Sequence, residues 1–328
     1  MKQTAKITVI ISIILALVTM FSIHVIAAEE TESVYIDGAG TFSYTVENDE
    51  ITITKFETDK TARIIEIPSE YEGMKVTKIG NNAFKDVNRY ALAKVVIPDT
   101  VTYIGNNAFY DKTETEIILP DTLKYIGNYA FYRCWKMTTN DLYIPEGAEY
   151  IGHYAFEDAN LNSITIADQE NFKMGAGVFD SCSSNNGIKM GNFKNCNLGN
   201  AFSGSYFNST FGDMENVTIG NGFFFNSNVR NVTFGNMKNV TFGEKTFGAC
   251  SNLKTVTFGD VEGLTMGKEA FSYTLSKLES VTFGDMKDCT FEENTFMYCE
   301  KLTNLEFGTC ENVIFGEKAF YKSCLLYT

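Results

Sequence analysis

His153 has the side chain best suited to acid–base chemistry, and it is the one histidine beyond residue 28. It lies in the segment IGHYAF (151–156), at the position that Asn81, Asn106 and Asn128 occupy in similar segments. A catalytic site needs converging partners, and the sequence holds no G-x-S-x-G, H-E-x-x-H or P-loop motif and no G-x-G-x-x-G leading into a helix. We therefore predict no catalytic residue, no cofactor and a protein that is not an enzyme.

The cysteines are the second group that could do chemistry. Four of the eight stand three residues after a phenylalanine that recurs along the chain: Cys134, Cys182, Cys250 and Cys299. Cys134 and Cys182 lie two repeats apart, roughly 10 Å if each repeat adds one strand spacing, which exceeds the ~7 Å that a disulfide tolerates. Cys299 and Cys324 lie in adjacent repeats and remain able to pair. Without a CxxC pair there is no argument for zinc, so we expect buried thiols.

Acidic residues follow the predicted strands at regular intervals. Turn chemistry accounts for them, because Asp favours the residues just after a strand. No EF-hand or Gly-Gly-x-Gly-x-Asp repeat is present, so we predict no metal site and leave calcium binding by this acidic row open. These residues are Asp99, Asp121, Glu146, Asp213, Asp260 and Asp285.

An internal repeat must position all these side chains. The string IGNNAF occurs at 79–84 and 104–109, and variants of it continue to FGEKAF at 315–320, with a defective copy, LGNAF, at 198–202. A β-branched run closed by Pro or Gly precedes each phenylalanine, as in VVIP (95–98) and VTFG (232–235), and predicts a strand with a defined end. Successive phenylalanines are 22 to 25 residues apart: Phe84, Phe109, Phe131, Phe156, Phe179, Phe202, Phe224, Phe247, Phe271, Phe296 and Phe320. The period predicts stacked coils with a continuous Phe and Ile/Val core.

The pattern IPxxV…IGxxAFxxC resembles the BspA-type leucine-rich repeat. The resemblance implies an α/β repeat fold: a leucine-rich-repeat-type solenoid of about eleven coils, each with one short strand plus a turn or short helix. It also implies an N-terminal β-hairpin cap, since TFSYTVENDEITITKF (41–56) looks like the hairpin that opens such arrays. The family is associated with adhesion and binding to host or matrix proteins, without shared catalytic residues.

The ends of the chain suggest its organisation. Lys2 and Lys6 precede an apolar run (7–26) and an Ala-Ala-Glu-Glu boundary, the layout of a cleaved export signal, with an uncleaved anchor as the alternative. We therefore expect a signal peptide at 1–28, a β cap at 29–60, and a solenoid at 61–328. The solenoid loses regularity at 181–210 and looks incomplete at its C-terminus, where no polar capping repeat follows. This organisation predicts a secreted or cell-surface protein with no membrane insertion after signal removal.

Net charge limits the partners. Without the two lysines of the signal, 25 basic and 41 acidic residues remain, a net charge of −16. Such a chain repels phosphate, so nucleic acid is excluded as a partner and anionic membrane surfaces are disfavoured.

The outward side of the strand column is the surface best able to bind a partner. Alternation about the inward Ile and Val residues points five side chains to solvent: Val96, Ile118, Tyr143, Thr165 and Lys189. The first three form an apolar and aromatic run, which is typical of an interface. Together with the resemblance, this run predicts an adhesin-like module that binds a host, matrix or cell-surface protein. The alternative is a structural spacer or targeting arm of a larger secreted protein whose effector domain lies beyond Thr328.

Overall fold

The computed structural model describes residues 31–37, 39–58, 63–137, 141–274 and 277–323. The chain divides into two units, Met1–Thr31 and Glu32–Thr328, and the description below concerns the second. The predicted signal peptide lies outside the described residues. In the part of the chain that the structure describes, every regular element is a β-strand, and no helix is long and apolar enough to span a membrane.

The strands form five sheets. One has nine strands: β1 (Glu32–Ile36), β2 (Gly40–Glu47), β3 (Glu50–Glu57), β5 (Glu70–Tyr71), β6 (Met74–Ile79), β8 (Tyr103–Ile104), β10 (Tyr125–Ile126), β12 (Tyr150–Ile151) and β16 (Lys173–Met174). A three-stranded sheet consists of β4 (Arg63–Glu66), β7 (Leu92–Val96) and β9 (Glu116–Ile118). The eight-stranded sheet contains β11 (Asp141–Ile144), β14 (Ser163–Ile166), β18 (Ile188–Met190), β20 (Ser209–Phe211), β23 (Asn231–Thr233), β26 (Thr255–Thr257), β29 (Ser280–Thr282) and β31 (Asn304–Glu306).

The remaining two sheets belong to the later coils. Ten strands form one of them: β15 (Gln169–Glu170), β19 (Phe193–Lys194), β21 (Met214–Glu215), β22 (Thr218–Ile219), β24 (Met237–Lys238), β25 (Thr241–Phe242), β27 (Val261–Glu262), β28 (Thr265–Met266), β30 (Met286–Phe291) and β32 (Cys310–Phe315). The other is the pair β13 (Asn160–Leu161) and β17 (Ser183–Ser184).

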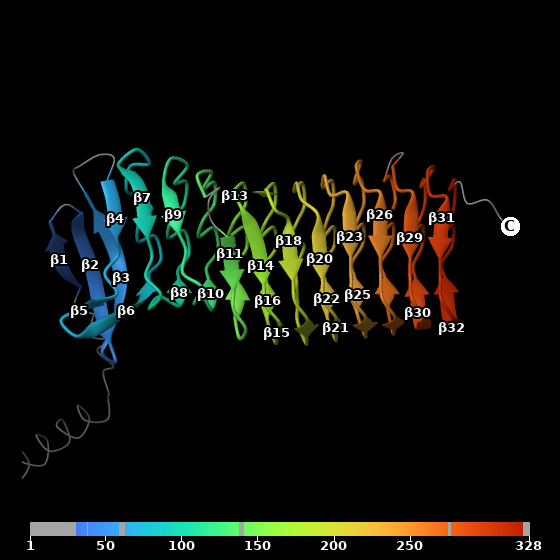
Figure 1. Cartoon of the computed structure of the whole chain (residues 1–328), viewed down its shortest axis with the longest axis horizontal. Coiled ribbons are helices and arrows are strands. Elements are labelled where there is room, and N and C mark those ends of the chain that lie inside the picture. Colours follow the sequence, from blue (N-terminus) through green and yellow to red (C-terminus); the bar gives the residue numbers. More distant parts are fainter. Residues whose placement is uncertain (1–30, 38, 59–62, 138–140, 275–276, 324–328) are drawn as a thin grey trace, which may run out of the picture. The chain divides into compact units, whose positions relative to one another are not determined.

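Successive coils stack in register. Within each sheet the strands of the coils pair in parallel with the equivalent strand of the next coil, so Ile104, Ile126 and Ile151 are direct partners in β8, β10 and β12. The equivalent strands consequently lie side by side from β4 to β32 (Figure 1). Repeated sequence positions therefore become rows of like side chains along the stack.

The IGxxAF segments are turns, which corrects the predicted α/β class and short helices. The second variable residue of these segments has positive φ, for example 60° at Asn82, 55° at Tyr129 and 55° at Glu269, and an α-helix cannot include it. Their backbone N–H groups also donate to the next coil: that of Phe84, for example, reaches the carbonyl of Ala108 at 2.9 Å. Each coil therefore completes its backbone hydrogen bonds with a neighbour instead of within a helix.

The recurring phenylalanines form the core. The first ten are at most 1 % exposed and Phe320 is partly buried, which confirms the predicted burial. Phe131, for example, stacks on Phe109 at 5.4 Å and on Phe156 at 5.1 Å between ring centroids. The row runs unbroken through the irregular segment 181–210, because Phe202 stacks on Phe179 at 5.3 Å and on Phe224 at 5.6 Å.

Antiparallel strands precede the first coil. β1 pairs with β2 and β2 with β3, and β3 then pairs in parallel with β6. Phe42 and Phe56 are both buried, and the ring of Phe56 stacks on Phe84 at 5.1 Å. These strands thus cover the first ring of the core, while the domain boundaries expected from the sequence stay a prediction.

Candidate functional site

The five predicted binding residues lie on two sheets. Val96 of β7 is paired with Ile118 of β9, whereas Tyr143, Thr165 and Lys189 are successive partners in β11, β14 and β18. All five alternate with buried neighbours, such as Val95 and Ile117, so their side chains point outward as the pattern predicts. Tyr143 is 38 % exposed, while Val96 and Ile118 are only partly exposed.

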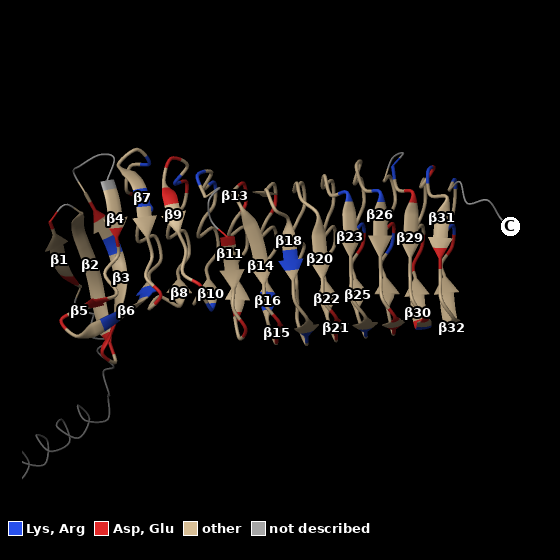
Figure 2. Cartoon of the chain, in the orientation of Figure 1, with Lys and Arg blue, Asp and Glu red and all other residues tan. Residues whose placement is uncertain are grey.

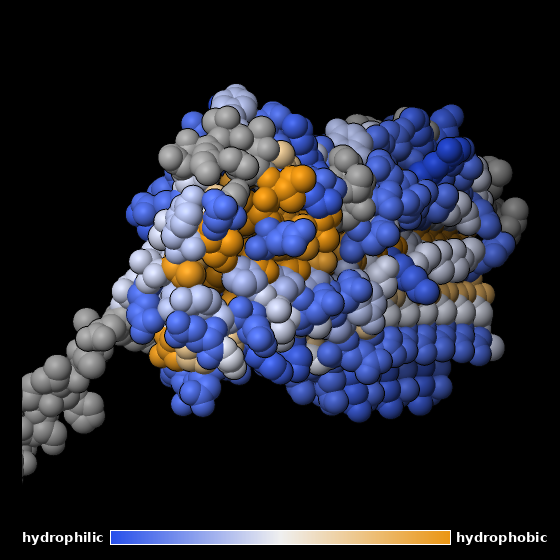
Figure 3. All heavy atoms as spheres, turned by 60° about the vertical axis from the view of Figure 1, so that its left-hand side comes forward, coloured by the Kyte–Doolittle hydropathy of each residue, from blue (hydrophilic) through white to orange (hydrophobic). Residues whose placement is uncertain are grey.

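One further apolar residue of this face was not predicted from the sequence. Ile64 of β4 is 63 % exposed, and its strand pairs with β7. The segment IEIP (65–68) matches the VVIP pattern and could have revealed this strand one coil earlier. We use the name strand-face patch for Ile64, Val96, Ile118 and Tyr143. In Figure 3, hydrophobic side chains gather on the part of the surface nearer the N-terminus, and rows of hydrophilic side chains with narrow hydrophobic rows between them run along the rest.

His153 has a structural role in a row of turn residues. In successive coils the Oδ1 atoms of Asn81, Asn106 and Asn128 each accept the backbone N–H of the equivalent residue in the next coil, at 2.7 to 2.8 Å. His153 continues the row, because its Nδ1 accepts the N–H of Ala176 at 2.8 Å. This hydrogen bond explains the presence of a histidine at this turn position.

The cysteines also complete backbone hydrogen bonds. The thiols of Cys134 and Cys250 donate to the carbonyls of Phe109 and Phe224 in the preceding coil, at 3.3 and 2.8 Å. Ser205 has the same contact, with its hydroxyl 2.5 Å from the Phe179 carbonyl. Burial raises the pKa of the Cys134 and Cys250 thiols to about 12, so they stay protonated donors. All seven cysteines among the described residues are free, and Cys324 lies outside them.

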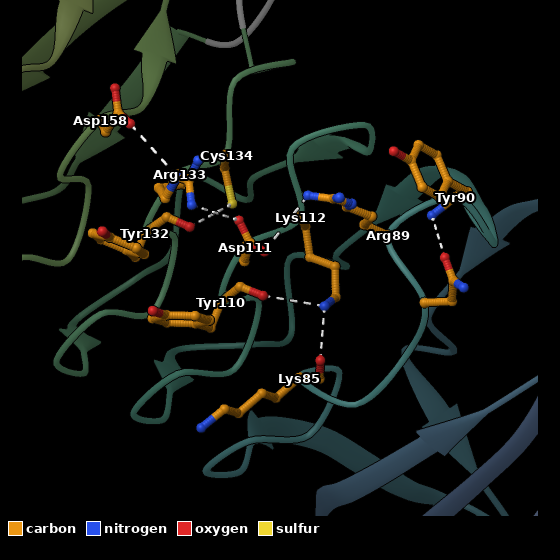
Figure 4. Close-up of polar contacts among 11 residues, drawn as sticks. Lys85, Arg89, Tyr90, Tyr110, Asp111, Lys112, Tyr132, Arg133, Cys134 and Asp158 are labelled. Carbon is orange, nitrogen blue, oxygen red and sulfur yellow. Dashed lines mark hydrogen bonds and ion pairs between the residues drawn. The ribbon is translucent and has the colours of Figure 1, made fainter.

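A cationic side chain takes this position in one coil. Lys112 is 2 % exposed, and its Nζ donates to the carbonyls of Lys85 and Tyr110 at 2.9 and 3.1 Å (Figure 4). Desolvation lowers the pKa of Lys112. Nearby, Arg133 bridges Asp111 and Asp158 at 3.6 and 3.7 Å. These groups therefore take part in structural contacts between coils.

The acidic row predicted from the sequence is likewise explained by turn geometry. Oδ1 of Asp213, Asp260 and Asp285 accepts the backbone N–H of the next coil at 2.7 to 2.9 Å. Within the described ranges, no group of three or more His, Cys, Asp or Glu residues is arranged to hold a metal ion.

A groove that the sequence analysis did not foresee follows the second strand of the later coils. Its volume is about 1210 Å³, and it extends from Glu146 to Glu311 along β15, β19, β21, β24, β27 and β30. Its floor is formed by one residue from each coil: Gln169, Phe193, Met214, Met237, Val261 and Met286. Charged residues of both signs recur along this row of strands (Figure 2). We call this feature the ladder groove.

Stacked parallel coils and a phenylalanine ladder define a leucine-rich-repeat solenoid of about eleven turns. Six copies of the BspA type leucine rich repeat region match residues 49–186 and 217–328, and the chain belongs to this family. A comparison with curated protein sequences finds no match.

Solved structures also resemble the chain. A leucine-rich repeat protein from Bacteroides ovatus is 20 % identical over 88 % of this chain and 80 % of its own, with a TM-score of 0.51, and supports the fold. A T. pallidum leucine-rich repeat protein is 19 % identical over 86 % of each chain, with a TM-score of 0.31. The pneumococcal vaccine antigen PcpA is 14 % identical over 87 % of this chain and 98 % of its own, with a TM-score of 0.36.

Proposed function

We propose that this chain is a secreted or cell-surface protein-interaction module with an adhesin-like role, and that it binds a protein partner through the strand-face patch. The observation that carries the proposal is the set of outward apolar side chains on two sheets: Ile64, 63 % exposed, lies on β4, which pairs with β7, and Tyr143, 38 % exposed, lies on β11 of the eight-stranded sheet. Contiguous exposed apolar area is typical of an interface, and interfaces depend on a few large anchors such as tyrosine.

The backbone beneath the patch supports the same function. Val95 and Ile117 are fully buried directly behind the patch, and the register of β7 and β9 holds Val96 opposite Ile118. A preformed surface loses little conformational entropy on binding, which favours affinity. The outward residues farther along, Thr165 and Lys189, extend the face with polar contacts of the kind found at an interface rim.

The test begins with capture of a partner from host or matrix proteins, followed by titration. Tyr143→Ala combined with Ile118→Ser should weaken binding by about 2 kcal/mol or more, about thirtyfold in Kd. The matched control is His153→Asn, because asparagine fills this position in the three preceding coils and keeps the acceptor. Equal affinity of the double variant and the parent would refute the strand-face model, provided that both show the same thermal unfolding.

A further inference from the structure

From β15 to β27 the ladder groove carries its charges in alternating coils, and the next coil, with Asp285 and Lys287, ends the alternation. Three coils present an Asp and a Glu each, and the two coils between them present an Asn and a Lys each. The parallel pairings from β15 to β27 place these coils in direct succession. In chain order the pairs are Asp168 with Glu170, Asn192 with Lys194, Asp213 with Glu215, Asn236 with Lys238, and Asp260 with Glu262.

The groove as a whole is acidic. Nine carboxylates and three lysines line it. Lys194 lies 3.6 Å from Glu215, and Lys238 lies 3.9 Å from Glu262, but these side chains are half exposed and such pairs are weak. A cationic partner is therefore attracted, and a polyanion is repelled.

The spacing of the acidic coils selects a backbone conformation for that partner. Neighbouring strands are about 4.8 Å apart, so every second coil recurs at about 9.6 Å. A polyproline II chain rises about 3.1 Å per residue with three residues per turn, which places every third side chain on one face at about 9.3 Å. A β-strand places successive side chains of one face about 6.8 Å apart, so already the second of them no longer lies opposite an acidic coil.

The floor of the groove includes one buried acceptor without a hydrogen-bond partner in the described part of the chain. Gln169 occupies the register position at which the next coils have Phe193 and Met214, and it is 4 % exposed. Its Nε2 donates to the Pro145 carbonyl at 2.7 Å, whereas its Oε1 has no hydrogen-bond partner among the described residues. A polyproline II chain has no internal hydrogen bonds, so its free N–H groups are donors that this oxygen lacks.

We propose that the ladder groove binds a cationic polypeptide segment in the polyproline II conformation, with Lys or Arg at every third residue opposite the acidic coils. This surface is separate from the strand-face patch, so either proposal can fail alone.

The experiment compares two fluorescent twelve-residue peptides of equal composition by anisotropy at low ionic strength. One has four Lys-Pro-Pro units, and the other has its four lysines together at one end. The triplet peptide should bind at least about fivefold more tightly, and added salt should weaken it because the charges are exposed. Equal affinity for the two peptides would show that the groove attracts positive charge without regard to its spacing, and would overturn the proposal. The absence of binding would overturn it as well.

Variants locate the binding site. Glu215→Gln with Glu262→Gln should weaken the triplet peptide about fivefold or more, since each lost charge pair contributes modestly. The control, Glu269→Gln with Glu293→Gln, removes two carboxylates that also pair with lysines, at 3.5 and 3.3 Å, but lie on the turns. Similar losses in both double variants would contradict the assignment to the groove. Tyr143→Ala with Ile118→Ser should leave peptide binding unchanged.

Discussion

Phe131→Ala is the perturbation that most directly tests the aromatic ladder. The Phe131 side chain is fully buried between two stacked rings, Phe109 at 5.4 Å and Phe156 at 5.1 Å. Truncating a buried phenylalanine to alanine costs about 3–5 kcal/mol, and each ring pair contributes about 0.5–1.5 kcal/mol of that cost beyond simple burial. We expect a loss of free energy of unfolding in the upper half of this range, because two ring contacts disappear together.

Double variants test whether coupling passes only between neighbouring coils. Phe131→Ala and Phe156→Ala share one ring contact, so the double variant should be less destabilised than the sum of the singles by about 0.5–1.5 kcal/mol. Phe271 stacks instead on Phe247 and Phe296, both at 4.9 Å, so Phe131→Ala with Phe271→Ala should be additive within about 0.5 kcal/mol.

Urea unfolding followed by circular dichroism measures these free energies. Variants are compared only where the free energy of unfolding falls with urea concentration at the same slope. Strict additivity for the adjacent pair, or strong coupling for the distant pair, would refute the nearest-neighbour ladder.

Three further predictions concern polar and titratable groups. Reductant should barely move the melting midpoint, because the seven described cysteines are free; a fall of many degrees would reveal disulfides that hold the coils. Cys250→Ala should lower the free energy of unfolding by about 1–3 kcal/mol, because it leaves the Phe224 carbonyl without its donor. Cys250→Ser should lower it clearly less, since serine fills this position in other coils. Equal losses of stability in the two variants, measured by thermal unfolding, would contradict this role of the thiol. Burial raises the pKa of Asp180 to about 6, so the folded state holds the extra proton and loses stability as pH rises from about 4 to 6. The free energy of unfolding of Asp180→Asn should therefore exceed that of the parent by on the order of 1 kcal/mol at pH 7, after allowance for partial solvent screening, and should equal it at pH 4. A constant difference in melting temperature across this pH range would argue against the titration.

Sequence reasoning succeeded where a side chain's environment is the same in every coil. Phe109 and Ile104 recur at fixed positions and are buried, because each coil must cover the apolar face of the next. The same reasoning failed for the IGxxAF turns. The left-handed backbone at Asn107 and the hydrogen bond from its N–H to the Asn128 carbonyl depend on a partner 21 residues away, which a local pattern cannot display.

The sequence by itself determined the repeat, its family, the buried ladder and the outward direction of Val96, Ile118 and Tyr143, because period and alternation specify which side chains face inward. Only the tertiary structure decided that a second strand in each later coil forms a groove with alternating charge. Lys194 and Glu215 are far apart along the chain, and only the stacking of their coils brings their charges within 3.6 Å of each other. A repeated sequence specifies which residues form a row, but the distances between rows follow from how each coil bends.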